Sequence, residues 1–150
     1  TNQVYAQFRG PYPALRTFFH GHTYTGNPLA CAAAIATLDT FDAENVLART
    51  VDSAEVLERE LSSLRTLASV AETRAKGMMG AVILQRRGKG PFAPGERVGH
   101  RVALAARKHG AIVRNLGDTV MVMPPLVIDT AEIRTLVGAV RKAICDVLGG

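Results

Sequence analysis

A polar loop that leads directly into an apolar helix is the feature that most restricts the folds open to this chain. Residues 20–27 read HGHTYTGN, and residues 28–36 read PLACAAAIA. Asn27 is a good N-cap and Pro28 a good first helical residue, so a helix is predicted from Pro28 to about Phe41. The loop offers hydroxyls, glycines and free N–H groups at a helix N-terminus, which suits an anion such as a phosphate. The alternative is a plain polar loop, and the residues alone leave both open.

The predicted helix is apolar on every side, and its first half is rich in small residues, namely five alanines and Cys31. A helix without a polar face is expected to be buried. Packing against a second subunit and packing inside one chain both satisfy this requirement.

Helical and strand patterns alternate through the rest of the chain. The periodicity predicts helices over 2–9, 43–66, 96–109 and after residue 129, and strands over 70–76, 78–84, 111–114 and 119–123. Residues 85–95 are expected to form an exposed loop and residues 115–118 a turn. The order predicts an α+β fold, with a short and largely antiparallel sheet that carries helices on one face.

Helix signals are strongest in the longer segments. In the 43–66 helix, Val51, Ala54, Leu57, Leu61 and Leu64 form one apolar stripe. In the last helix, the residue at position 129 is Asp and the residue three positions later is Glu, which predicts a capping box.

Composition argues against several classes of function. The 18 Lys and Arg residues exceed the 13 Asp and Glu residues, but they are scattered, apart from a small cluster at 86–89, and there is no Trp. This distribution does not favour a nucleic-acid interface. No apolar run approaches the roughly 20 residues of a membrane span. Cys31 and Cys145 have no CxxC spacing, so we expect two buried free thiols in a reducing compartment, the cytoplasm.

No complete catalytic or metal-binding set is found in the sequence. There is no G-x-S-x-G elbow and no G-x-x-x-x-G-K-[ST] phosphate loop. His20, His22, His100 and His109 lack the spacing and carboxylate partners of a metal site, so no metal is expected.

Arg114 is a second candidate for ligand binding. It ends a predicted strand made otherwise of Ala, Ile and Val, just before a turn. A guanidinium fork at a strand end suits a carboxylate. An exposed arginine at the rim of the sheet is the alternative.

Two separated runs resemble one enzyme family. The run from His20 to Ala32 closely resembles class III aminotransferases, which belong to the fold type I group of pyridoxal-phosphate enzymes. The run from Gly110 to Asp118, followed by Met123-Pro124-Pro125-Leu126, resembles the carboxyl-terminal region of the same class. Both are most similar to the branch that acts on 8-amino-7-oxononanoate in biotin synthesis, and the resemblance spans essentially all 150 residues.

The resemblance implies roles for four residues. It implies that Thr23 binds the phosphate of pyridoxal 5'-phosphate in the neighbouring subunit's site, and that His22 adds a backbone contact to this cofactor. Many members of the class have Pro where His22 stands. Gly21 is then expected to lie against the substrate, and Arg114 to pair with the substrate carboxylate. The implied assembly is a homodimer with shared active sites.

The resemblance also implies how the chain is divided. Residues 1–42 correspond to the end of the cofactor (large) domain with a connecting helix, and residues 43–150 to the small C-terminal domain. Lys76, Lys89, Lys108 and Lys142 do not match the Schiff-base lysine of the class, which is expected before residue 1. The 150 residues are therefore expected to be the carboxyl-terminal portion of a longer enzyme, with no catalytic residue and no activity alone.

The function implied for the whole enzyme is amination of 8-amino-7-oxononanoate to 7,8-diaminononanoate, with S-adenosylmethionine or lysine as the donor. Two alternatives stay open. One is another class III ω-amino-acid transaminase, and the other is a non-catalytic dimerisation or binding module built on the alanine-rich helix.

Overall fold

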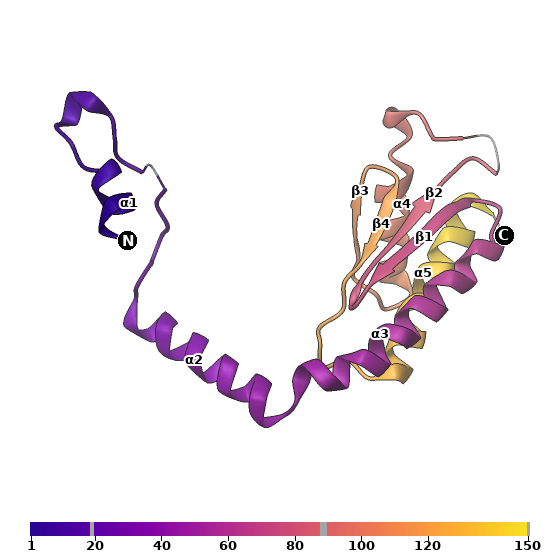
Figure 1. Cartoon of the computed structure of the whole chain (residues 1–150). Coiled ribbons are helices and arrows are strands. Elements are labelled where there is room, and N and C mark those ends of the chain that lie inside the picture. Colours follow the sequence, from indigo (N-terminus) through magenta and orange to yellow (C-terminus); the bar gives the residue numbers. More distant parts are fainter. Residues whose placement is uncertain (19, 88–89, 150) are drawn as a thin grey trace. The chain divides into compact units, whose positions relative to one another are not determined.

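The computed structural model describes residues 1–18, 20–87 and 90–149. Gly88 and Lys89, which belong to the predicted loop and to the basic cluster, lie outside the described residues. The chain divides into two compact units, Thr1–Asp39 and Thr40–Gly150, which are described one after the other (Figure 1).

The first unit is mostly helical and lacks a core. It contains helix α1 (Asn2–Gln7), a 3₁₀ turn at Tyr12–Ala14 and most of helix α2 (Pro28–Ala43), which confirms both helices predicted from the sequence. None of its described residues is buried. The rings of Phe8 and Phe18 make an edge contact with their centroids 5.4 Å apart.

Helix α2 is exposed along nearly its whole length, and only Phe41 is half-buried. Leu29, Ile35 and Leu38 are 82%, 60% and 65% exposed, and no residue of the helix is buried. The expectation of a buried helix is thus not met within the described residues, and the two packing alternatives stay open. Cys31 is exposed and Cys145 half-buried, so the prediction of two buried thiols is wrong.

The second unit is built on a four-stranded sheet. Its strands are β1 (Val70–Lys76), β2 (Met79–Leu84), β3 (Arg114–Leu116) and β4 (Thr119–Val122). They lie in the order β1-β2-β4-β3, and every neighbouring pair is antiparallel. A bulge interrupts β1 between Val70 and Glu72. The α+β class and the antiparallel sheet are thus confirmed.

Three helices cover one face of this sheet. They are α3 (Val46–Ser63), α4 (Val98–Lys108) and α5 (Thr130–Leu148), and Figure 1 shows them packed beside the strands. Alternate strand residues point into the core that the helices close, among them Val82, Leu84, Val120 and Val122. The other face, here called the open face, carries Glu72, Arg74, Met79, Ala81, Ile83, Arg114, Leu116 and Met121, none of which is buried.

The prediction for helix α3 needs two corrections. Helix α3 begins at Val46, three residues later than predicted, because Asn45 adopts a left-handed conformation with φ 49°. A non-glycine residue in this conformation cannot continue a right-handed helix. Leu57, Leu61 and Leu64 of the predicted stripe are buried, but Val51 is exposed.

The third strand is shifted from its predicted position. The prediction placed it at residues 111–114, whereas β3 starts at Arg114 and ends at Leu116. Leu116 pairs with Thr119 across a turn of two residues, Gly117 and Asp118. Gly117 has φ 56°, which suits the first position of a two-residue hairpin turn. The turn therefore determines which residues form β3, and the apolar residues 111–113 lie before the strand.

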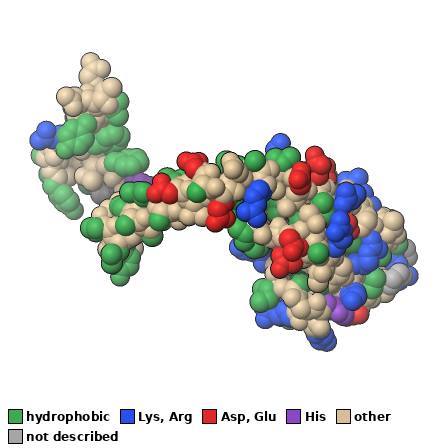
Figure 2. Space-filling model, turned by 90° about the horizontal axis from the view of Figure 1, so that it is seen from below, with side chains coloured by type: hydrophobic (Ala, Val, Ile, Leu, Met, Phe, Trp, Pro, Cys, Tyr) green, Lys and Arg blue, Asp and Glu red, His purple; other side chains and the backbone are tan. Residues whose placement is uncertain are grey.

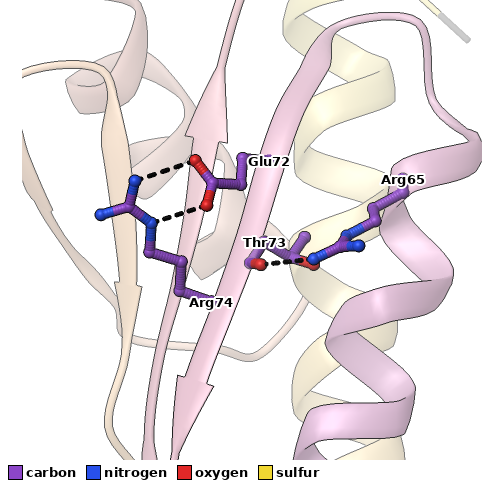
Figure 3. A network of polar contacts seen from close by, with 4 residues as sticks. All are labelled: Arg65, Glu72, Thr73 and Arg74. Atoms are coloured by element: carbon purple, nitrogen blue, oxygen red, sulfur yellow. Dashed lines mark hydrogen bonds and ion pairs between the residues drawn. The ribbon is translucent and has the colours of Figure 1, made fainter.

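The capping box of α5 forms as predicted. The N–H of Glu132 donates to Asp129 Oδ1 at 2.7 Å, and the N–H of Asp129 donates to Glu132 Oε2 at 3.0 Å. A second polar contact ties the 3₁₀ turn Leu64–Thr66, which follows α3, to the sheet. Arg65 Nε donates to Thr73 Oγ1 and its Nη2 to Thr73 O, both at 2.8 Å (Figure 3).

Charge is spread unevenly over the chain. Arg9 and Arg16 are the only basic residues of Thr1–Asp39. In Figure 2, Lys and Arg side chains gather on the second unit, whereas many side chains on the visible surface of the first unit are hydrophobic. Among the described residues, no helix has both the length and the hydropathy needed to cross a membrane.

Candidate functional site

The polar loop forms a turn on the N-terminus of α2, as the sequence predicts. Residues 23–26 make the turn, with Tyr24 and Gly26 in the left-handed region at φ 62° and 72°. The side chain of Asn27 caps the helix by accepting from the N–H of Ala30 at 3.1 Å. The N–H of Asn27 in turn donates to Tyr24 O at 3.0 Å, which closes the turn onto the helix.

The two threonines of this turn differ in their contacts. Thr25 Oγ1 donates to His22 O at 3.3 Å and so supports the loop itself. Thr23 is exposed, and within the described part of the chain its hydroxyl has no hydrogen-bond partner. A Cβ atom at Gly21 or Gly26 would meet nothing within 4 Å. The turn thus offers a hydroxyl and open space to a ligand.

These features suit the phosphate group of pyridoxal 5'-phosphate. A phosphate accepts hydrogen bonds from hydroxyls and from backbone N–H groups at a helix N-terminus. Thr23 supplies the hydroxyl, and α2 begins five residues later, at Pro28.

His20 and His22 contact each other beside the turn. Their Nε2 atoms lie 2.8 Å apart, and the rings meet edge to face with centroids at 4.4 Å. One nitrogen must donate and the other accept, so this contact requires at least one neutral ring. In the described residues, no group of three or more His, Cys, Asp or Glu side chains could hold a metal ion.

Arg114 is the first residue of β3 and lies on the open face of the sheet. It is exposed, and the described residues contain no hydrogen bond or ion pair to its side chain. A free guanidinium can bind a carboxylate through two parallel hydrogen bonds. The sequence pattern placed Arg114 at the end of a strand, whereas it begins β3. Its exposed guanidinium fits both the carboxylate-binding hypothesis and the alternative of a rim arginine.

Arg74 lies on the same face but is already paired. Its Nε and Nη2 donate to the two carboxylate oxygens of Glu72 at 2.8 Å and 2.9 Å. The hydrogen bonds lower the pKa of Glu72 and raise the pKa of Arg74. Figure 3 shows this pair on one side of β1 and Thr73 with Arg65 on the other.

The hairpin that carries Arg114 is held by contacts that the sequence analysis missed. The N–H of Gly99, in the first turn of α4, donates to Asp118 Oδ1 at 3.1 Å. Asn115 Nδ2 donates to Gly117 O at 2.9 Å within the hairpin. A glycine at the start of an otherwise amphipathic helix was the available signal, since such a position allows close approach of another backbone.

The predicted site residues belong to different units. Gly21, His22 and Thr23 are consecutive residues of Thr1–Asp39, whereas Arg114 belongs to Thr40–Gly150. The loop therefore offers groups that suit a phosphate, and the sheet offers a group that suits a carboxylate, each within its own unit.

Comparison with known proteins bears on both the polar loop and Arg114. The family model described as "Aminotransferase class-III" matches residues 1–144. The chain is 45% identical over its whole length to adenosylmethionine-8-amino-7-oxononanoate aminotransferase of Geobacter sulfurreducens, of which it covers 34%. It is 47% identical over 98% of its length to the protein of the same name from Nitratidesulfovibrio vulgaris, of which it covers 28%.

Solved structures give a matching result. The crystal structure of adenosylmethionine-8-amino-7-oxononanoate aminotransferase from Methanocaldococcus jannaschii has a TM-score of 0.82 and 36% identity, over 98% of this chain and 34% of that one. A thermostable (S)-enantioselective ω-transaminase from Thermomicrobium roseum has a TM-score of 0.80 and 38% identity, over 88% of this chain and 30% of that one. The chain thus spans about a third of the length of these relatives.

Proposed function

The chain belongs to the class III aminotransferase family, and from this premise we propose that it forms part of a transaminase that acts on a keto acid with a free carboxylate. The similarity to solved transaminases confirms the predicted fold type I domain, and membership of the family implies pyridoxal 5'-phosphate as the cofactor. When bound, this cofactor carries the amino group from the donor to the acceptor.

The substrate that we propose is 8-amino-7-oxononanoate, which the enzyme would convert to 7,8-diaminononanoate. The names of the relatives from G. sulfurreducens and N. vulgaris support this choice. The observation in the structure that carries the proposal is Arg114, an exposed guanidinium without a partner in the described residues. It lies where the resemblance expects the contact with the substrate carboxylate. S-adenosylmethionine and lysine both remain proposed donors.

Arg114→Ala in the full-length protein tests this role. The loss of a hydrogen-bonded charge pair costs about 1.5–3 kcal/mol, which corresponds to a roughly ten- to hundredfold higher Michaelis constant. We expect this increase for the keto acid and not for the amino donor. If both constants rise equally, Arg114 does not hold the substrate carboxylate.

We propose that Thr23 binds the cofactor phosphate, with His22 adding a backbone contact and Gly21 leaving room for the substrate. The free hydroxyl of Thr23 and the open space at Gly21 support these roles. Thr23→Ala should weaken cofactor binding by roughly tenfold or more. Thr25→Ala is the matched control, since its hydroxyl bonds to the loop itself. A titration with pyridoxal 5'-phosphate that gives equal affinities for both variants and the wild type would show that Thr23 does not bind the cofactor phosphate.

The proposed assembly is a homodimer in which α2 packs against its counterpart, so that Thr23 serves the site of the other subunit. The apolar and fully exposed surface of α2 supports this arrangement. The proposed location is the cytoplasm, which the two free cysteines support. We further propose that the 150 residues alone do not transaminate. Dialysis of this chain with pyridoxal 5'-phosphate should leave no bound cofactor absorbance.

A second candidate function is an ω-transaminase with another amine or keto acid. The similarity to the T. roseum ω-transaminase favours it. The two functions differ in the acceptor that the enzyme prefers. Activity on 8-amino-7-oxononanoate that exceeds activity on other keto acids supports the first function, and the reverse order supports the second.

A further inference from the structure

Arg114 lies within a strip of aliphatic side chains on the open face. The pairing of β3 with β4 places Arg114 directly opposite Met121. Burial alternates along the chain from residue 111 to 116, so Ile112 and Leu116 lie on the same side as Arg114. These two side chains are 85% and 76% exposed. Exposed apolar side chains gathered around one charge indicate a binding surface rather than an ordinary solvated face.

The strip continues across the sheet in a single row. Met121 is opposite Ala81 on β2, and Ala81 is opposite Arg74 on β1. Because neighbouring strands lie about 4.8 Å apart, the row extends about 10 Å from Arg114 to Ala81. A hollow of ≈ 570 Å³ lies at the part of the row farther from Arg114, lined by Met79, Ala81 and Met121 and also by the charged residues Glu58, Arg74 and Lys76. The small side chain of Ala81 leaves room there for an aliphatic chain.

The two arginines at the ends of the row differ in availability. Glu72 occupies the guanidinium of Arg74 with two hydrogen bonds, at 2.8 Å and 2.9 Å. Arg114 has no such partner among the described residues. A ligand with one carboxylate is therefore oriented, with its charge on Arg114 and its chain over the apolar part of the row.

We propose that Met121, together with Ile112 and Leu116, selects the length of the aliphatic chain on a carboxylate held by Arg114. The inference rests on the proposed carboxylate role of Arg114 and adds specificity-determining residues to it. The chain of the ligand lies across Met121 and points toward the hollow over Ala81. Methionine suits this position because its flexible thioether adapts to an aliphatic partner.

Calorimetric titration of the full-length protein with butanoate, hexanoate and octanoate tests the inference without any catalytic turnover. For the wild type, the dissociation constant should fall about two- to fourfold for every methylene that the face covers. In Met121→Ala, the dissociation constant should fall by less than about 1.5-fold per methylene, and the dissociation constant of butanoate should be almost the same as in the wild type. Met121→Leu should restore the wild-type decrease. Leu104→Ala removes an exposed apolar side chain from α4 and should have no effect.

Two results separate this inference from the proposed function. If Arg114→Ala weakens all three acids while Met121→Ala leaves the chain-length dependence intact, the inference is wrong and the carboxylate role of Arg114 stands. If Arg114→Ala leaves all three dissociation constants unchanged, the carboxylate role itself is wrong. Wild-type protein that binds octanoate no better than butanoate also overturns the inference.

Discussion

Gly99 lies where the first turn of α4 meets the β3–β4 turn, and the contact leaves no space for a side chain. A Cβ atom at this position would lie 2.2 Å from Gly117 O and 3.0 Å from Asp118 Cα. Both are backbone atoms, so no change of rotamer relieves the clash. The N–H of Gly99 also donates to the Asp118 carboxylate. Gly99→Ala must therefore move the hairpin that carries Arg114 away from the helix.

The size of the effect follows from these two contacts. Inserting a methyl group into a fully packed contact costs about 1–3 kcal/mol, and loss of a hydrogen bond to a charged acceptor costs about 1.5–3 kcal/mol. We expect Gly99→Ala to lower the free energy of unfolding by about 2.5–6 kcal/mol if both contacts are lost. Urea unfolding followed by far-ultraviolet circular dichroism measures this difference.

Gly138→Ala is the matched control. Gly138 lies inside α5, and a Cβ atom there would meet nothing within 4 Å. Alanine restricts the unfolded chain and favours the helix, so this variant should equal the wild type or gain about 0.4–1 kcal/mol. If Gly99→Ala and Gly138→Ala unfold at the same urea concentration, the close contact between α4 and the hairpin does not support the fold.

Three further predictions concern the other parts of the molecule. Asp129→Ala removes the side-chain cap of α5 and should lower the free energy of unfolding by about 1 kcal/mol; an unchanged urea midpoint would contradict this. Ile35→Glu places a charge on the apolar surface of α2, so sedimentation of the full-length protein should show a shift from dimer to monomer, whereas an unchanged dimer would exclude α2 from the interface. Hydrogen bonds from Arg74 lower the pKa of Glu72 from its usual 4.5, so the stabilisation by this carboxylate is present above that pH and is lost as the pH falls through the lower, folded-state pKa. Glu72→Gln should therefore make the melting temperature slightly less sensitive to acid, and an unchanged acid dependence would show that the pair contributes nothing.

The hairpin shows what local patterns could and could not predict. Residues 111–113 are more β-prone than residues 114–116, so the pattern favoured a strand three residues too early. In the structure, the two-residue turn at Gly117 and Asp118 decides which residues pair with β4. Register depends on the partner strand and on the turn, and neither is visible in the propensity of a single segment.

The same distinction holds for the candidate site. Thr23 and Arg114 were found because their residue types suit a phosphate and a carboxylate at the end of a regular element. The contact between Gly99 and Asp118 was missed because it joins residues 19 positions apart. Helix α2 was predicted correctly, but its apolar pattern could not indicate what covers it. Among the described residues, none of the helix is buried.

The two edges of the sheet restrict how this unit can associate with other proteins. One edge strand, β3, is only three residues long. The other, β1, is bent by its bulge near Val70 and carries the charged side chains of Glu72, Arg74 and Lys76. Short, bulged and charged edges resist the addition of a further strand. Association through this unit must therefore use side-chain surfaces and not main-chain pairing, which protects an otherwise small sheet from growing into aggregates.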